Sequence, residues 1–166
     1  MVFAYYHRLG KTQQAIYRHS DSITHVALNQ TADIRGSATL LEAALATEDR
    51  IKTQQACRAL VYGITRDLKL VSAEIRVLSA RPSHNWGELH GLYEPAAGNT
   101  AARITVWMRT ARHKRVVAFR TFLRTVLHEL CHHLDYELFQ LADSFHTEGF
   151  FKRETSLFRQ MVSDDS

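Results

Sequence analysis

Cysteine is scarce in this sequence, and its scarcity narrows the possible classes of protein. Only Cys57 and Cys131 occur among 166 residues, and no C-x-x-C pair is present. A disulfide-rich secreted framework and a zinc site built from cysteines are therefore both excluded. We expect the two cysteines to be free thiols that pack in the interior.

Long hydrophobic runs are also missing. No stretch approaches the ~18 consecutive apolar residues of a membrane-spanning helix, and the first residues lack the charged and apolar regions of a secretion signal. Proline occurs only at positions 82 and 95, and neither a repeat nor a low-complexity tract is present. We therefore expect a cytoplasmic protein without a membrane partner, and the sequence does not predict its oligomeric state.

The size and composition of the chain suit one globular domain. A chain of 166 residues with 45% hydrophobic content can bury one sizeable core but hardly two. We therefore place a single domain over residues 1–166. Residues 1–35 show no sustained period, and we expect them to be an irregular lead-in with one short helix around residues 12–18.

The sequence does contain a metal-binding motif. His128, Glu129 and His132 form the pattern H-E-x-x-H, in which two imidazoles stand four residues apart with a carboxylate beside the first. On a helix this spacing places both imidazoles on one face, where together they can hold one metal ion.

The motif lies in a segment with the period of an amphipathic helix. Apolar residues recur there at intervals of three and four without Pro or Gly, at Phe119, Leu123, Val126, Leu127, Leu130, Leu134, Leu138 and Leu141. This stripe centres near Leu130, about half a turn from His128 and His132. One long helix is therefore predicted over residues 119–141, with the two histidines on the face opposite the core.

A turn and a second helix are expected next. Asp143 and Ser144 are good helix-starting residues, and an apolar-periodic stretch follows through residues 157–161. A short turn between two helices lets the start of the second helix lie beside the first, close to the metal.

A third ligand should come from this turn, because two protein ligands hold zinc poorly. His146 follows His132 with thirteen residues between them. Glu148 and Glu154 stand at plausible separations for a carboxylate ligand and remain alternatives. Asp135 lies on nearly the same face of the helix and could orient a ligand imidazole through its second nitrogen.

These residues resemble the SprT-like zinc metallopeptidase family. In that family an H-E-x-x-H helix is followed after about a dozen residues by a third histidine in a pattern similar to H-x-x-x-F, which His146 and Phe150 match. The resemblance implies one zinc ion (Zn2+) per chain, bound by His128, His132 and His146. It also implies that Glu129 is the catalytic base and that the substrates are polypeptides, including DNA-associated proteins. Longer members carry a Cys-rich zinc ribbon, which this chain lacks.

The expected chemistry is hydrolysis of peptide bonds. Zinc lowers the pKa of a bound water toward 7 and polarises a carbonyl group. Glu129 takes the proton of this water as it attacks the carbonyl carbon, and then protonates the leaving amine. Tyr93 and Tyr136 are not assigned as oxyanion donors, because each is expected to be a packing aromatic residue.

Upstream of the helix, two segments alternate with the period of a strand. Apolar and polar residues alternate over residues 71–77 and over residues 103–109. A shorter strand is expected from Trp86 to Tyr93, between turns around Pro82 and Pro95. These segments predict a three-stranded antiparallel meander. Because a strand before the metal helix pairs with extended substrates in the resembling family, residues 103–109 are the expected substrate strand.

The remaining helices complete the expected fold. Residues 38–45 and 51–68 are rich in Ala and Leu and are predicted to be helical. The fold class is therefore α+β, with N-terminal helices, a small three-stranded antiparallel sheet, the long metal helix and a C-terminal helix that follows the third ligand.

Negative charge is absent from a long stretch of the chain. No acid occurs between Glu94 and Glu129, and this stretch supplies the excess behind the net charge of +4 through Arg103, Arg109, Arg112, Lys114, Arg115, Arg120 and Arg124. The basic stretch from Arg103 to Arg124 could contact nucleic acid. One alternative function is therefore a basic nucleic-acid-associated module with structural zinc. A second is a regulatory peptidase of the ImmA/IrrE-like class, another minimal H-E-x-x-H type.

Overall fold

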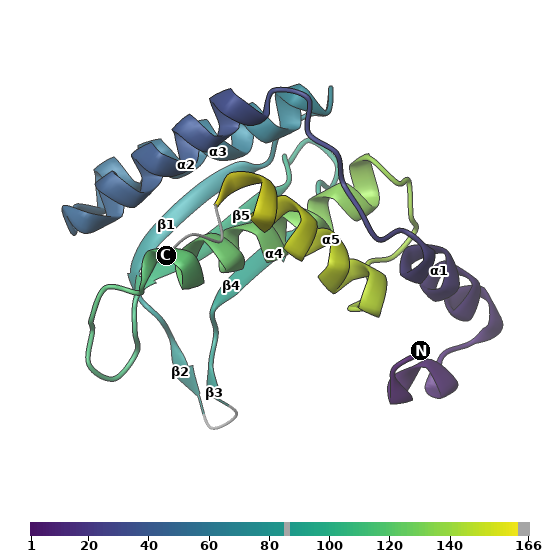
Figure 1. Cartoon of the computed structure of the whole chain (residues 1–166). Helices are drawn as coiled ribbons and strands as arrows, with labels where there is room; N and C mark the ends of the chain where they lie inside the picture. Colours follow the sequence, from purple (N-terminus) through teal and green to yellow (C-terminus); the bar gives the residue numbers. More distant parts are fainter. Residues whose placement is uncertain (85–86, 163–166) are drawn as a thin grey trace.

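Helices and a small mixed sheet give the chain an α+β fold in a computed structural model that describes residues 1–84 and 87–162 (Figure 1). The expected fold class is therefore confirmed. In chain order the elements are η1 (Ala4–Arg8), α1 (Lys11–Ser22), α2 (Thr31–Ala46), α3 (Arg50–Asp67), β1 (Glu74–Ala80), β2 (Ser83–His84), β3 (Gly87–Glu88), β4 (Gly91–Glu94), β5 (Arg103–Arg109), α4 (Phe119–Glu137) and α5 (Glu148–Met161).

The main sheet has the strand order β1-β5-β4. β1 runs parallel to β5, with Val77 beside Val106, and β4 runs antiparallel to β5, with Tyr93 beside Ile104. The predicted antiparallel meander is therefore wrong about β1, which pairs with β5 and runs parallel to it. The reason is burial, because β5 is buried on both faces from Ile104 to Met108, and a strand covered on both faces belongs in the centre of a sheet.

Helices cover the sheet and bring the site together. α2 and α3 lie side by side along the β1 side of the molecule, and α4 packs against β4 and β5 (Figure 1). α5 packs against α4 and also contacts α1 and α2. One cluster of buried apolar side chains extends from Val26 to Met161 and includes residues of both the N-terminal helices and α4.

Several predicted bounds shift in the structure. α1 is longer than the short helix predicted around residues 12–18, and α2 begins at Thr31, inside the predicted lead-in. β1 begins at Glu74, so Val71 lies before the strand and is exposed. Of the strand predicted from Trp86 to Tyr93, Trp86 lies outside the described residues, and the part that joins the main sheet is β4.

The turn after α4 also differs from the prediction. α4 ends at Glu137, and α5 begins at Glu148 with Thr147 as its N-cap, whose hydroxyl accepts a hydrogen bond from the Phe150 N–H at 2.9 Å. Asp143 and Ser144 therefore belong to the connection between the helices. Their side chains are the right type for a cap, but Phe145, His146 and Thr147 still precede the first residue of α5.

A buried arginine ties three helices together. Arg153 of α5, only 1% exposed, donates from Nη1 to the carbonyls of Ser20 and Ile23 at the end of α1, each at 2.6 Å. Its Nη2 donates to Asp135 Oδ1 of α4 at 2.8 Å. Gly149 allows the close approach, because a Cβ there would lie 2.5 Å from the Asp21 carbonyl oxygen.

The cysteines and the helix lengths bear on two expectations from the sequence. Cys57 and Cys131 are both free and buried, as expected. Among the described residues, every helix is too short or too polar to cross a membrane.

Replacing Gly149 by Ala should loosen the contact between α1 and α5. The new methyl group would meet the backbone oxygens of Ser20 and Asp21, at 2.7 and 2.5 Å, and backbone cannot move aside cheaply. We expect Gly149→Ala to lower the free energy of unfolding by about 1–3 kcal/mol, measured by urea denaturation.

Gly36→Ala is the matched control for this change. Gly36 also lies inside a helix, α2, but a Cβ there meets no atom within 4 Å. Alanine should therefore stabilise the protein by about 0.5–1 kcal/mol through its better helix propensity. Equal effects of the two substitutions would show that α1 and α5 do not approach as closely as described.

Candidate metal centre

The helix α4 presents His128 and His132 on one face. They stand one turn apart and are half-buried, whereas Leu130 and Cys131 between them are buried in the core. The two imidazoles therefore lie where the amphipathic pattern predicted them, on the side of α4 away from the leucine stripe. Their ring centroids lie 5.2 Å apart.

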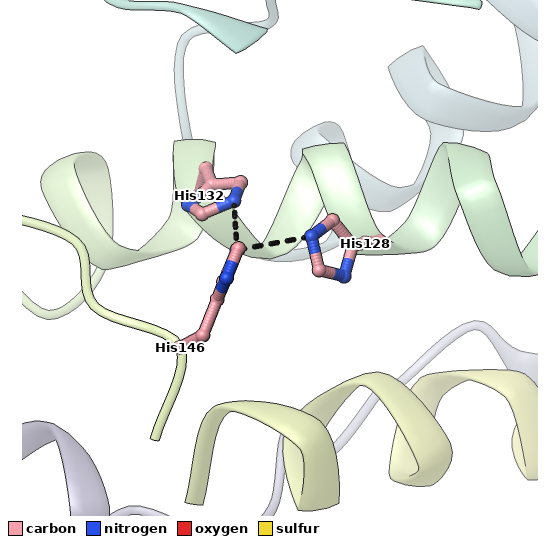
Figure 2. Close-up of side chains that lie close together, drawn as sticks. All are labelled: His128, His132 and His146. Carbon is pink, nitrogen blue, oxygen red and sulfur yellow. Dashed lines mark hydrogen bonds between the residues drawn. The ribbon is translucent and has the colours of Figure 1, made fainter. Parts of the chain in front are cut away.

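His146 comes from the connection between α4 and α5 and points at both helical histidines (Figure 2). Its Nε2 lies 3.1 Å from His128 Nε2 and 3.0 Å from His132 Nε2. The Tyr5 hydroxyl donates to the His146 carbonyl oxygen at 2.7 Å, so the N-terminal segment supports this residue. The buried ring of Phe150 lies 4.8–5.1 Å from all three imidazole rings, which explains the aromatic residue four positions after the histidine.

The three Nε2 atoms fit the ligand set of a zinc ion. Metal–nitrogen bonds of about 2.0–2.1 Å place the ligand atoms of a tetrahedral centre roughly 3.3 Å apart, close to the separations around His146. Among the described residues, His128, His132 and His146 form this group without a cysteine or carboxylate. A metal bound there would keep a position that the protein does not fill, as in catalytic sites.

The outward-facing nitrogens of the two helical histidines are also engaged. His128 Nδ1 lies 2.9 Å from Glu154 Oε1, and His132 Nδ1 lies 2.7 Å from Ser144 Oγ. Ser144 in turn donates to Asp135 Oδ2 at 2.7 Å. Hydrogen bonds of this kind fix the orientation of metal-ligating imidazoles.

The carboxylates that the sequence offered as alternative ligands lie outside the group of converging nitrogens. Glu154 lies behind His128 as its hydrogen-bond partner and not among the three converging nitrogens. Glu148 is turned away, toward Lys152 and the N-terminal amine. Asp135 reaches His132 only through the Ser144 hydroxyl.

Burial sets the protonation of the site. It lowers the pKa of His132 to about 3, with the neighbouring His146 and His128 adding to the shift, and it also lowers the pKa of His146. Neutral imidazoles are the form that binds a metal. Burial raises the pKa of Glu129 to about 7, while His128 opposes this shift and Glu154 adds to it.

Glu129 lies between α4 and the strand β4, close to Gly91. A Cβ at Gly91 would lie 2.8 Å from Glu129 Oε1 and 2.9 Å from the Thr125 side chain. Only glycine leaves room here for the carboxylate to lie against the strand. Sequence reasoning did not identify Gly91, because the close approach depends on two segments far apart in the chain.

A cleft of about 700 Å³ surrounds the histidines. The strand β4 and its flanking residues form one wall, through Leu89, His90, Gly91, Leu92, Tyr93 and Pro95. The exposed face of α4 and part of the following connection form the other wall, through residues that include Thr121, Arg124, Thr125, Tyr136 and Ser144. Glu129 and the three histidines therefore line this cleft.

The strand available for pairing is β4, which corrects the prediction that residues 103–109 bind the substrate. β5 has β1 on one side and β4 on the other, so it has no free edge. β4 is an edge strand of the main sheet and lines the cleft. At the opposite edge, α3 blocks β1, because Gln54 Oε1 accepts from the Val77 N–H and Arg50 Nη1 donates to the Val77 carbonyl.

The other aromatic and histidine residues near the site have structural contacts. Tyr93 stacks at 6.2 Å from His132 and at 6.1 Å from Tyr136. Its hydroxyl lies 2.8 Å from His133 Nδ1, and His133 Nε2 lies 2.7 Å from the Val71 carbonyl. Since a carbonyl only accepts, Nε2 carries the proton of a neutral His133, and Tyr93 donates to Nδ1. His133 therefore lies outside the group of three converging histidines.

The basic stretch does not form one unpaired surface. Arg103 pairs with Glu74, Arg109 with Glu48, and Arg124 with Glu154, at 3.1–3.3 Å. The exposed cations of this stretch are Arg112, Lys114 and Arg115, in the connection between β5 and α4, and Arg120, in the first turn of α4.

Comparisons of the chain with protein-family models, with curated proteins and with solved structures return no match.

Purified protein should contain close to one zinc ion per chain, and His146→Ala should contain much less. The substitution leaves two ligands on α4, which hold zinc poorly. Elemental analysis of protein prepared without a metal-binding tag measures this directly. His113→Ala, which removes an exposed histidine from the β5–α4 connection, is the control and should retain the metal. Wild type that takes up no zinc even when zinc is supplied contradicts the three-histidine centre.

Glu129→Gln should stabilise the metal-free protein at high pH. The raised pKa means that the folded chain keeps a proton on Glu129 between pH 4.5 and about 7, where the unfolded chain has lost it. The contribution of protonated Glu129 to the free energy of unfolding is thus lost as the pH rises from 4.5 to about 7. We expect the variant to gain on the order of 1–2 kcal/mol in unfolding free energy at pH 8 and little at pH 4.5. Glu42→Gln, on the exposed side of α2, should show no such pH-dependent gain.

Proposed function

We propose that this chain is a zinc metallopeptidase, similar to the SprT-like family, that hydrolyses peptide bonds of polypeptides bound in an extended conformation. The observation that carries the proposal is the convergence of three imidazole nitrogens beside Glu129, in a cleft with an edge strand along one wall. Each part supplies one requirement of the reaction: a metal site, a base and a place for the substrate backbone.

The ligand set supports a catalytic metal over a structural one. Structural zinc sites are closed by four protein ligands, often cysteines. Here three histidines come together, and among the described residues the group contains neither a cysteine nor a carboxylate. Zinc held by them would supply Lewis acidity toward a carbonyl and toward water.

Glu129 is the proton carrier in this proposal. It accepts a proton from the attacking water and returns it to the leaving amine, so it must change protonation state near neutral pH. In the metal-free chain, burial raises the pKa of Glu129 to about 7, close to the pH at which this exchange would take place. Its position between α4 and Gly91 places the carboxylate beside the strand that would hold the substrate backbone.

The edge of β4 is the proposed binding element for the substrate backbone. An extended peptide added to an exposed strand makes main-chain hydrogen bonds that do not depend on its sequence. The cleft walls are largely apolar near β4, through Leu89, Leu92, Tyr93 and Pro95, so apolar side chains would be accommodated beside the backbone. Unfolded polypeptides of varied sequence are therefore the proposed substrate class.

DNA-associated proteins are a second level of this proposal. The exposed cations Arg112, Lys114 and Arg115 lie in the connection that leads directly into α4. A basic loop of this kind can contact phosphate groups without reading a base sequence. In this proposal the loop binds nucleic acid that carries the protein substrate, and the nucleic acid itself is not cleaved.

Cleavage of an unfolded protein tests the proposal. Zinc-loaded wild type should cleave reduced, denatured casein, and Glu129→Gln should bind the same amount of zinc and lose at least about a hundredfold in cleavage rate, because general acid–base transfer contributes about that much or more. Gel analysis of fragments and elemental analysis of both proteins provide the measurements.

Thr39→Ala, on the exposed side of α2, serves as the preparation control and should cleave at the wild-type rate. Equal cleavage by wild type and Glu129→Gln would point to a contaminating protease or to a different base. Zinc-loaded wild type that cleaves neither casein nor a mixed library of unstructured peptides contradicts the peptidase proposal.

A further inference from the structure

The two ring nitrogens of His132 face different partners, His146 at the candidate metal position and Ser144. Its Nε2 faces the candidate metal position, 3.0 Å from His146 Nε2, and its Nδ1 faces Ser144 Oγ at 2.7 Å. A neutral imidazole carries one proton, on either nitrogen. Only a ring protonated on Nδ1 leaves the Nε2 lone pair free for a metal.

The neighbours of Ser144 decide where that proton lies. Asp135 accepts from Arg153 through Oδ1 at 2.8 Å and from the Ser144 hydroxyl through Oδ2 at 2.7 Å. Asp135 and Arg153 are 0% and 1% exposed, so the carboxylate faces its guanidinium partner without water between them. An ionised carboxylate can only accept hydrogen bonds. Ser144 therefore gives its single proton to Asp135, and its oxygen must accept from His132 Nδ1.

We propose that Ser144 is a positioning residue, through which the buried Asp135–Arg153 pair holds the proton of His132 on Nδ1 and keeps Nε2 free for zinc. The inference rests on the proposed zinc centre. It assigns different supports to the two helical ligands, because His128 Nδ1 meets the carboxylate of Glu154 directly, whereas His132 meets its carboxylate through one hydroxyl.

The geometry separates this role from a purely structural one. Ser144 is half-buried in the α4–α5 connection, and its backbone N–H donates to the Asp143 side chain at 2.9 Å, a contact that does not involve Oγ. Removing Oγ therefore leaves the local turn in place. It removes only the groups that link His132 to Asp135.

Ser144→Ala tests this hydrogen-bond relay, which runs from Asp135 through Ser144 to His132, in two measurements. In zinc-free protein at pH 7.5, the ¹⁵N shifts of the His132 ring should report the Nδ1–H form in wild type and a loss of that preference in Ser144→Ala. Zinc affinity, measured by competition with a chelator, should fall about 10- to 100-fold, the usual effect of losing such a partner. Ser144→Thr keeps a hydroxyl at this position and should restore both.

Ser156→Ala provides a matched control. Ser156 Oγ lies 2.7 Å from His25 Nδ1, the same kind of contact at the same distance, outside the metal cleft. Its removal should leave zinc affinity and the His132 ring unchanged. An unchanged His132 ring in Ser144→Ala, or an unchanged zinc affinity, overturns the relay. A wild type that binds no zinc while its His132 ring still depends on Ser144 refutes the zinc peptidase instead and leaves the hydrogen-bond relay standing.

Discussion

The buried ion pair between Asp135 and Arg153 is the interaction on which the rest of the site depends. Removing two charges from water is expensive, and hydrogen bonds to the other polar atoms of the pair offset part of that cost. Here the partners come from separate parts of the chain, namely the Ser20 and Ile23 carbonyls of α1 and the Ser144 hydroxyl. The pair therefore requires α1, α4, α5 and the connection before α5 to assemble together.

Arg153 and Glu154, which are neighbours in α5, contact opposite sides of that assembly. Arg153 points into the interior toward Asp135, and Glu154 points toward the cleft, where it contacts His128 and Arg124. Arg124 is held in place by the ring of Phe158, 4.1 Å away. A rotation of α5 by even one residue would break both sets of contacts, so the packing that stabilises the core and the contacts that orient the histidines cannot change independently.

Local patterns made much of this predictable, and long-range geometry made the rest unpredictable. The H-E-x-x-H spacing and the leucine stripe fix the exposed face of α4, because both are properties of a single helix. The place of β5 could not be read in the same way: Thr105 and Trp107 look like the solvent face of a half-buried strand, yet they are only 5% and 8% exposed. Ser144 has the chemistry of a helix cap, and only the folded chain brings its hydroxyl between His132 and Asp135.

The unequal edges of the main sheet limit how copies of this chain can associate. A sheet with two open edges can add molecule after molecule and grow into a fibre. Side chains of α3 occupy the outward backbone groups of β1 at Val77, which leaves β4 as the edge that can accept another strand. Two copies joined through β4 would form a closed, two-fold symmetric pair with no further edge to extend. A cleft bordered by an open strand edge is thus compatible with a protein that does not polymerise through that strand.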